Sequence, residues 1–146
     1  MIARSAGRML VLDPDNRVLL LEHRTGLDSD ETVWAAPGGG CEPGESPVQA
    51  ARRELAEECG FSIAPVSDAP VLIERRDWSL GGIAYDQTDH FFLAHADRQP
   101  PVLDVYRTEW EAHAVLGHRW FSAEELLASP VRFEPAGLPE LLAALR

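Results

Sequence analysis

The sequence predicts an α/β fold in which helices pack on a mixed β-sheet. Three observations lead to this prediction: apolar runs of strand length lie on both sides of a strong helix signal, the chain has 146 residues, and 45% of them are hydrophobic. A chain of this length can build one core but not two. Strands placed before, between and after helices are typical of the α/β class. We therefore expect a single domain over residues 1–146.

The N-terminal part is predicted to begin with a β-hairpin. Apolar runs at Met9–Leu12 and Val18–Leu21 flank the turn formers Asp13–Asn16. Gly26–Thr32 is polar and acidic, so we expect an exposed loop there. The following stretch, Trp34–Gly44, contains three consecutive glycines and two prolines and is expected to form no regular element.

The strongest helix signal runs from Ser46 to Cys59. Ser46 is a good N-cap, Pro47 suits the first helical position, and Gln49 completes a capping box. Gly60 is placed to end the helix in the left-handed conformation. The apolar residues at helical spacing, which we expect to be buried, are Val48, Ala51, Leu55 and Cys59.

Strands and short helices are expected to fill the second half. Val71–Arg76 and Ile83–Tyr85 are predicted strands around a turn at Ser79–Gly82, and Asp89–His95 is a predicted central strand. Asp97–Pro101 is expected to be a turn or linker.

The C-terminal part is predicted to hold one more strand and two helices. The strand is Arg119–Phe121, and Ser122 then caps a short helix through Leu127. Gly137–Leu145 is the predicted final helix.

Composition excludes several functions. The formal net charge is −11, which disfavours a sequence-independent nucleic-acid binder and a protein that docks on acidic lipid. All thirteen basic residues are arginine, so Schiff-base chemistry on a lysine is excluded. Two cysteines are too few for a disulfide scaffold, and a reducing, cytoplasmic setting is expected. No apolar run approaches the roughly 20 residues that span a bilayer.

Three carboxylates are expected on one face of the predicted helix. Glu54, Glu57 and Glu58 are spaced by three and four residues, which places them within about 100° of arc. Like charges at this spacing cost roughly 0.2–0.5 kcal/mol per pair, and a divalent cation would reverse the sign. Hard oxygen ligands suit Mg²⁺ or Mn²⁺. A solvated acidic face is the alternative that these three residues leave open.

The spacing around these glutamates favours the metal site. Gly39 is followed after five residues by Glu45 and after seven more by Arg53–Phe61, in the pattern G-x5-E-x7-R-E-U-x-E-E-x-G-U, where U is apolar. In this the sequence resembles the Nudix hydrolases. Trp34–Gly40 and Arg119–Leu126 are also similar to sequences of that family.

The resemblance implies a fold and a reaction. The fold is an α/β/α sandwich, with the Nudix helix and a C-terminal helix packed on a mixed sheet. The reaction is hydrolysis of a pyrophosphate bond in a nucleoside diphosphate linked to another group X, with Mg²⁺ or Mn²⁺ as cofactor. Many relatives pair as dimers, so a homodimer is also an expectation. No nucleic-acid or membrane partner is expected.

The resemblance also assigns roles to residues. The Gly39 carbonyl, Glu57 and Glu58 are expected metal ligands, and Glu54 either joins them or accepts a proton from water. Glu45 and Arg53 are expected to pair with each other or to orient the catalytic glutamates, with direct phosphate contact by Arg53 as a lesser alternative. The general base is left open between Glu54, Glu58 and a downstream glutamate at position 109 or 111.

Residues outside the motif are weaker candidates for substrate binding. For each of them surface charge or core packing is an equally simple interpretation. They are Arg24, Trp34, Arg76, Trp78 and Glu111.

An alternative function is a Nudix domain that binds a nucleotide as a sensor without turnover. Noncatalytic members usually lose glutamates of the motif, whereas this chain retains all of them. A metal-dependent isomerase of the isopentenyl diphosphate type ranks lower, because its motif is usually degenerate. The enzyme is therefore the favoured interpretation.

Overall fold

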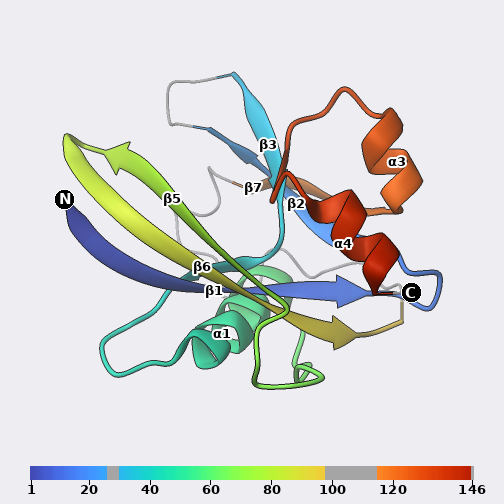
Figure 1. The fold of residues 1–146 in the computed structure, drawn as a ribbon, viewed down its shortest axis with the longest axis horizontal. Coiled ribbons are helices and arrows are strands. Elements are labelled where there is room, and N and C mark those ends of the chain that lie inside the picture. The colour runs from blue at the N-terminus through green and yellow to red at the C-terminus, as the bar shows by residue number, and fades with distance from the viewer. Residues whose placement is uncertain (26–29, 98–114, 146) are drawn as a thin grey trace.

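A computed structural model describes residues 1–25, 30–97 and 115–145. The described part is an α/β/α sandwich, with α1 on one face of the sheet and α3 and α4 on the other (Figure 1). The strands are β1 (Ile2–Leu12), β2 (Val18–Arg24), β3 (Thr32–Ala35), β4 (Gly38–Gly40), β5 (Leu72–Leu80), β6 (Ile83–His95), β7 (Val115–Phe121) and β8 (Phe133–Glu134). The helices are α1 (Pro47–Cys59), α3 (Ala123–Ala128) and α4 (Leu138–Ala144).

The sheet is mixed, as predicted. Its order is β5-β6-β1-β2-β3-β8, with β4 also paired to β1 and β7 to β2. β1 and β6 run parallel over their whole common length, from Ile2↔Tyr85 to Leu12↔His95. β1 and β2 pair at Leu12↔Val18, which confirms the predicted hairpin, and β4 pairs with β1 farther back at Ala6–Arg8.

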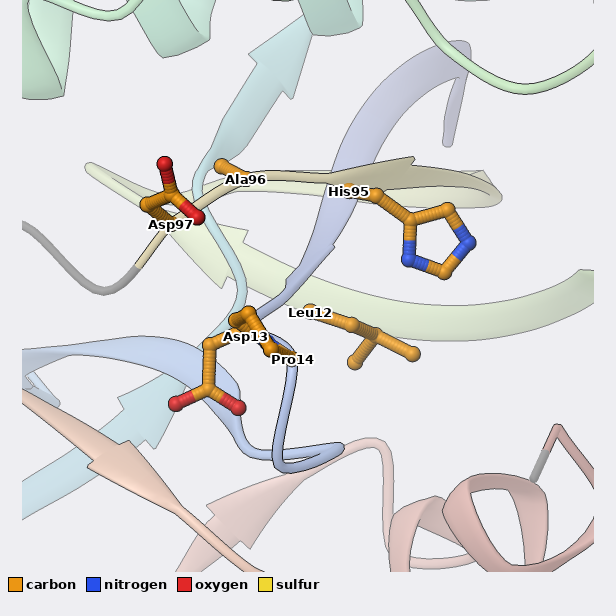
Figure 2. A pocket seen from close by; sticks show the side chains of 6 residues that line it. All are labelled: Leu12, Asp13, Pro14, His95, Ala96 and Asp97. Carbon is orange, nitrogen blue, oxygen red and sulfur yellow. The ribbon is translucent and has the colours of Figure 1, made fainter.

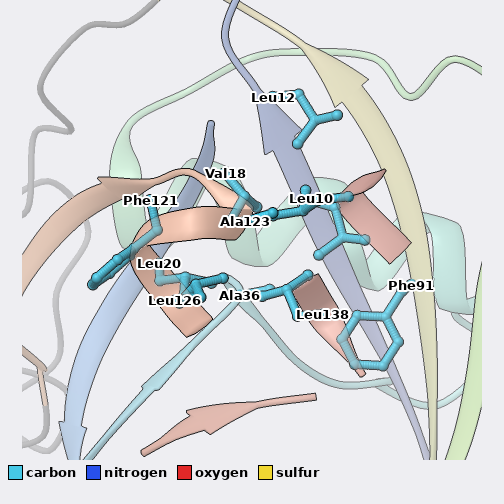
Figure 3. Close-up of a cluster of buried hydrophobic side chains, with 11 residues drawn as sticks. Leu10, Leu12, Val18, Leu20, Ala36, Phe91, Phe121, Ala123, Leu126 and Leu138 are labelled. Carbon is cyan, nitrogen blue, oxygen red and sulfur yellow. The ribbon is translucent and has the colours of Figure 1, made fainter. Parts of the chain in front are cut away.

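Side chains of the central strands alternate between two cores. On β1, Leu10 and Leu12 face α3 and α4, whereas Met9 and Val11 face α1. Figure 3 shows the first of these clusters, in which Leu126 and Leu138 of the two short helices meet the sheet. Both faces of the sheet are therefore covered, as the apolar runs of the central strands predict.

α1 has the ends that its sequence predicts. The capping box of Ser46 and Gln49 is formed, and Gly60 closes the helix at φ 73°. Ala51, Leu55 and Cys59 are buried as expected, while Val48 is partly buried. The helix packs very closely on β1. A Cβ at Gly7 would lie 1.8 Å from the Pro47 carbonyl oxygen.

Several predicted boundaries are wrong. Trp34–Gly44 is not free of regular structure, because β3 ends at Ala35 and Gly38–Gly40 forms β4. A strand needs backbone pairing rather than side chains, and the glycines let β4 approach neighbours that a Cβ would hit. Ile83–Tyr85 and Asp89–His95 are parts of the single strand β6.

Other elements are longer or shorter than expected. β1 begins at Ile2 and β5 continues to Leu80, which leaves only Gly81-Gly82, both at positive φ, for the turn. α3 and α4 are confirmed within a residue of their predicted ends. Most of the predicted linker Asp97–Pro101 lies outside the described residues. None of the helices in the described ranges is long and apolar enough to cross a membrane.

Candidate active site

Arg53 and Glu45 form a two-pronged ion pair at the start of α1. The Arg53 Nε donates to Glu45 Oε2 and its Nη2 donates to Glu45 Oε1, both at 2.9 Å. A guanidinium matches a carboxylate in this planar arrangement. The hydrogen bonds from Arg53 hold the pKa of Glu45 below its usual value. The predicted pairing of these residues is confirmed.

The same guanidinium contacts two more glutamates and the glycine strand. Its Nη1 donates to Glu54 Oε1 at 3.0 Å and to Glu57 Oε2 at 3.1 Å. Its Nη2 donates to the Gly40 carbonyl at 3.0 Å. The hydrogen bond with Glu45, followed by the charge and hydrogen bond of Glu54, raises the pKa of Arg53, so its positive charge is permanent. One cation therefore gathers Glu45, Glu54 and Glu57 beside β4, although like charges at these spacings repel one another.

Glu58 connects α1 to β4 from the other side. Its Oε1 accepts a hydrogen bond from the Gly38 N–H at 2.8 Å, and the residue is 8% exposed. Gly38 and Gly40 thus turn polar backbone groups toward α1. Hydrogen-bonded pairs alternate along an antiparallel ladder. Because Met9 N–H donates to the Pro37 carbonyl and Cys41 N–H to the Ser5 carbonyl, the alternation assigns Gly39 to the pairs bonded with β1.

Gly39 provides space for the Glu54 carboxylate. A Cβ built on Gly39 would lie 2.6 Å from Glu54 Oε1, closer than real Cβ atoms come. The glycine therefore forms a cradle that any other residue would fill.

The donor set suits a hard divalent ion, because Glu54, Glu57, Glu58 and nearby backbone carbonyls offer only oxygen. Within the described ranges, no three His, Cys, Asp or Glu side chains are arranged as a preformed metal site. The contacts explain this: Arg53 holds Glu54 and Glu57, while Glu58 is turned to Gly38. Metal binding at these residues therefore requires their side chains to change contacts.

A cavity of about 360 Å³ adjoins this cluster and touches Gly38. Arg24, Arg76 and Trp78, all predicted substrate residues, line it together. The other lining residues are Arg8, His23, Thr25, Val33, Ala35, Ser79, Arg132 and Glu134. We refer to it as the arginine cavity.

Burial, followed by the charge of Arg8, lowers the pKa of His23 to about 4, so this imidazole is neutral at pH 7.

A family model described as the NUDIX domain matches residues 1–142. The chain belongs to the Nudix family. It is 30% identical over 129 residues to an RNA pyrophosphohydrolase of Cereibacter sphaeroides (strain KD131), an alignment that covers 82% of this chain and 78% of that protein. The chain is accordingly a Nudix hydrolase that acts on pyrophosphate bonds.

Solved Nudix structures share the fold. The solution structure of the E. coli ORF135 protein gives a TM-score of 0.61 at 28% identity, covering 99% of this chain and 89% of that chain. The structure of the E. coli dihydroneopterin triphosphate pyrophosphohydrolase gives a TM-score of 0.68 at 18% identity, covering 99% of this chain and 97% of that chain.

Nudix hydrolases generally use divalent metal ions, which agrees with the oxygen-rich donor set on α1.

Of the other predicted substrate residues of this Nudix hydrolase, Trp34 faces away from the arginine cavity. Val33 and Ala35 line it, so the alternation of β3 directs Trp34 to the opposite side, where its ring meets Phe121 at 5.3 Å between centroids. Trp34 packs on the core there. Glu111 lies outside the described residues, as does Glu109.

Arg4, which no sequence motif singles out, also lies beside the glycine strand. Its guanidinium lies 5.5 Å from the centroid of the Trp78 ring, which itself stacks on Tyr85 at 4.4 Å. A Cβ at Gly40 would lie 2.2 Å from Arg4 Nη2, so the guanidinium reaches the glycine strand. The side chain has no ion pair with the described residues. No motif marks Arg4, because β1 meets β4 only through tertiary pairing.

A second cavity, of about 350 Å³, lies at the opposite end of β1 (Figure 2). It contains His95, Asp13 and Asp97, but Figure 2 shows these side chains pointing in different directions. Asp13 Oδ1 accepts hydrogen bonds from the N–H groups of Asp15 and Arg17, which makes it part of the hairpin turn. None of the described residues that line this cavity belongs to the Nudix motif.

Proposed function

We propose that this Nudix hydrolase cleaves the pyrophosphate bond of a nucleoside diphosphate linked to a group X, with Mg²⁺ or Mn²⁺. The observation that carries the proposal is the contact set of Arg53, which holds Glu45 in two hydrogen bonds and gathers Glu54 and Glu57 beside the glycine strand. Glu58 completes the acidic set from its position at Gly38.

Glu54, Glu57 and Glu58 would hold the metal, together with a backbone carbonyl of Gly38–Gly40. The resemblance to the Nudix motif favours the Gly39 carbonyl, whereas the hydrogen bonds favour Gly38 or Gly40, whose polar groups face α1. A bound divalent ion supplies charge neutralisation at the phosphate oxygens and activation of water. The strongly acidic chain would otherwise repel an anionic substrate.

The protein side chains supply the proton transfer and the orientation. In the hydrolysis, a bond forms between the oxygen of water and one phosphorus, and the bridging P–O bond breaks so that the other phosphate leaves. A carboxylate accepts the proton of the water, for which Glu54 and Glu58 are the candidates within the described ranges. Arg53 and Glu45 act as positioning residues, because their ion pair fixes the guanidinium that touches Glu54.

Arg4 is proposed to bind a phosphate oxygen. Its guanidinium is held by the Trp78 ring near Gly40 and has no carboxylate partner among the described residues. A guanidinium offers only donors and pairs well with phosphate. An incoming substrate supplies the missing acceptor.

The substrate is proposed to be a small nucleotide. The net charge of −11 weakens binding to a long polyanion, which depends on many basic contacts. The name of the Cereibacter sphaeroides relative, RNA pyrophosphohydrolase, makes the 5′ end of RNA the second candidate. A sensor without turnover is less well supported, because every glutamate of the motif is present.

A substrate panel tests the proposal. Purified protein is incubated with nucleoside triphosphates, dinucleoside polyphosphates, ADP-ribose, nucleotide sugars and 5′-triphosphorylated RNA, each with Mg²⁺, with Mn²⁺ and with EDTA. We expect metal-dependent turnover of at least one small nucleotide. Tight nucleotide binding without turnover of any compound would favour the sensor instead, and turnover of RNA alone would replace the small-nucleotide assignment.

A further inference from the structure

We propose that the group X of the preferred substrate is itself anionic, and that the arginine cavity binds its charge. This inference rests on the proposed function and narrows its substrate class. Four arginines reach one cavity in a chain whose net charge is −11. They come from separate segments and are Arg8 on β1, Arg24 on β2, Arg76 on β5 and Arg132 just before β8.

The carboxylates around these arginines do not neutralise them. Among the described lining residues Glu134 is the only carboxylate. Asp89 lines a neighbouring cavity, which shares Arg8, Arg76 and Glu134 with this one. Asp89 is 3.6 Å from Arg8 and 3.1 Å from Arg76. Glu134 is 3.7 Å from Arg76 and 3.4 Å from Arg132. Three guanidiniums thus share two carboxylates, and Arg24 adds a fourth positive charge, so the described residues leave two positive charges in excess.

The shared carboxylates also orient the guanidiniums. Asp89 is 4% exposed and accepts a hydrogen bond from Gln87 Nε2 at 2.7 Å, so it is a fixed anchor rather than a mobile surface group. Gln87 in turn accepts from the Trp78 indole at 2.9 Å. Arg8 is further held by its donation to the Ala36 carbonyl at 3.0 Å. Less side-chain entropy is lost on binding when the receiving groups are already positioned.

Arg24 differs from the other three. It is exposed at the end of β2, and its guanidinium has no ion pair among the described residues. Of the four charges it is therefore the one most available to a ligand. His23 beside it is neutral, so it neither adds to nor offsets this charge at pH 7.

The chemistry of the lining points to an anionic ligand. A guanidinium has five donors and no acceptor, so the donors that Asp89 and Glu134 leave unused favour a ligand rich in acceptor oxygens. A neutral sugar needs acceptors from the protein as well, and the described lining offers few side-chain acceptors, namely Glu134, Ser79, Thr25 and the neutral His23. Because the cavity touches Gly38, which binds Glu58, a ligand that fills it is adjacent to the acidic set.

Matched substrates test this inference. ATP and diadenosine tetraphosphate carry an anionic X, whereas ADP-ribose carries a neutral ribose, and all share the adenosine. We expect the wild type to favour the first two in kcat/KM by at least about tenfold at low salt, and the preference to shrink as ionic strength rises. The variants are Arg24→Gln and Arg132→Gln. Arg75→Gln is the control, since Arg75 lies on the same strand as Arg76, is exposed and pairs with Asp86.

Each cavity variant is expected to lower kcat/KM for the anionic-X substrates about tenfold or more, mainly through KM, and to change that for ADP-ribose less than about twofold. Arg75→Gln should leave all three values within about twofold. A preference of the wild type for ADP-ribose, or equal losses on all substrates in Arg24→Gln and Arg132→Gln, would overturn the inference while leaving the proposed hydrolysis intact. Failure to turn over these three and every other nucleotide of the panel with either metal would instead count against the proposed function.

Discussion

The Glu58 carboxylate accepts a hydrogen bond from the Gly38 N–H at 2.8 Å, and this contact joins the Nudix helix to the glycine strand. Glu58 is 8% exposed, whereas the side chain of Glu57, one residue earlier, is 34% exposed and accepts a hydrogen bond from Arg53. These two adjacent glutamates of the motif therefore differ in burial and in hydrogen-bond partner. This difference makes their variants distinguishable.

Glu57→Gln and Glu58→Gln are each expected to lower kcat at least about 10²-fold, the effect of losing an electrostatic or acid–base group. Stability should separate the two sites. Glu58→Ala leaves the Gly38 N–H without its acceptor and should cost about 1–3 kcal/mol of unfolding free energy, while Glu57→Ala should cost less than about 1 kcal/mol. Urea unfolding in EDTA measures this. Rates near wild type in both Gln variants would remove the metal-site assignment.

Arg53→Lys is expected to reduce kcat about tenfold or more with little change in KM. Lysine keeps the charge but cannot make the two parallel hydrogen bonds to Glu45 or reach Glu54, Glu57 and the Gly40 carbonyl together. Steady-state kinetics on the best substrate of the panel measure the effect. Arg52→Lys, at the exposed neighbouring position, is the control and should behave as wild type.

Gly39→Ala is expected to lower activity because its methyl group would meet the Glu54 carboxylate at 2.6 Å. The carboxylate is the end of a flexible side chain, so it should move aside and the fold should survive. We expect a clear loss of kcat and a raised metal concentration for half-maximal activity. Gly137→Ala, where a Cβ meets nothing within 4 Å, is the matched control. Equal activity of the two variants would contradict the cradle.

Arg4→Gln is expected to raise KM and lower kcat/KM about tenfold, because a charge-assisted bond to phosphate is lost. Arg4→Lys should recover part of the loss, since a point charge remains. The unfolding free energy should change by less than about 1 kcal/mol, because Arg4 has no ion pair with the described residues. Kinetics indistinguishable from wild type in Arg4→Gln would exclude a phosphate contact.

His23 should make stability depend on pH. Its pKa is about 4 in the folded chain and about 6.5 when unfolded. Between these values the unfolded chain binds more protons, so the free energy of unfolding should fall as pH falls from about 6.5 toward 4 and stay flat above 6.5 with respect to this group. His23→Gln should flatten that part of the profile, as followed by urea unfolding at several pH values. An unchanged slope would show that the imidazole is not held neutral by burial.

The parts of the fold that the sequence predicts are those determined by interactions between residues close together in the chain. Ser46, Gln49 and Gly60 act within one or two turns, so both ends of α1 were predictable, and the three glutamates could be placed on one face. β4 could not be predicted in the same way, because glycines have no strand preference of their own and pair with β1 only after folding.

The site shows the same limit. The Arg53–Glu45 pair was predictable because the motif fixes its spacing, and Arg24, Arg76 and Trp78 could be named only as weak candidates. No motif or spacing in the sequence singles out Arg4, Arg8 or Arg132. Their placement depends on which strands become neighbours, and this leaves no local signal in the chain.

Arg8 and Gly7 are consecutive residues of β1, yet Gly7 lies under the Nudix helix and Arg8 points into the arginine cavity. In the proposed assignment, the two faces of this one strand separate cleavage from selectivity. Substitution of the cavity arginines could then change which leaving group is accepted, because it leaves the packing of the helix that carries the glutamates unchanged. Related enzymes with a different substrate specificity and the same hydrolytic chemistry are the expected outcome of such an arrangement.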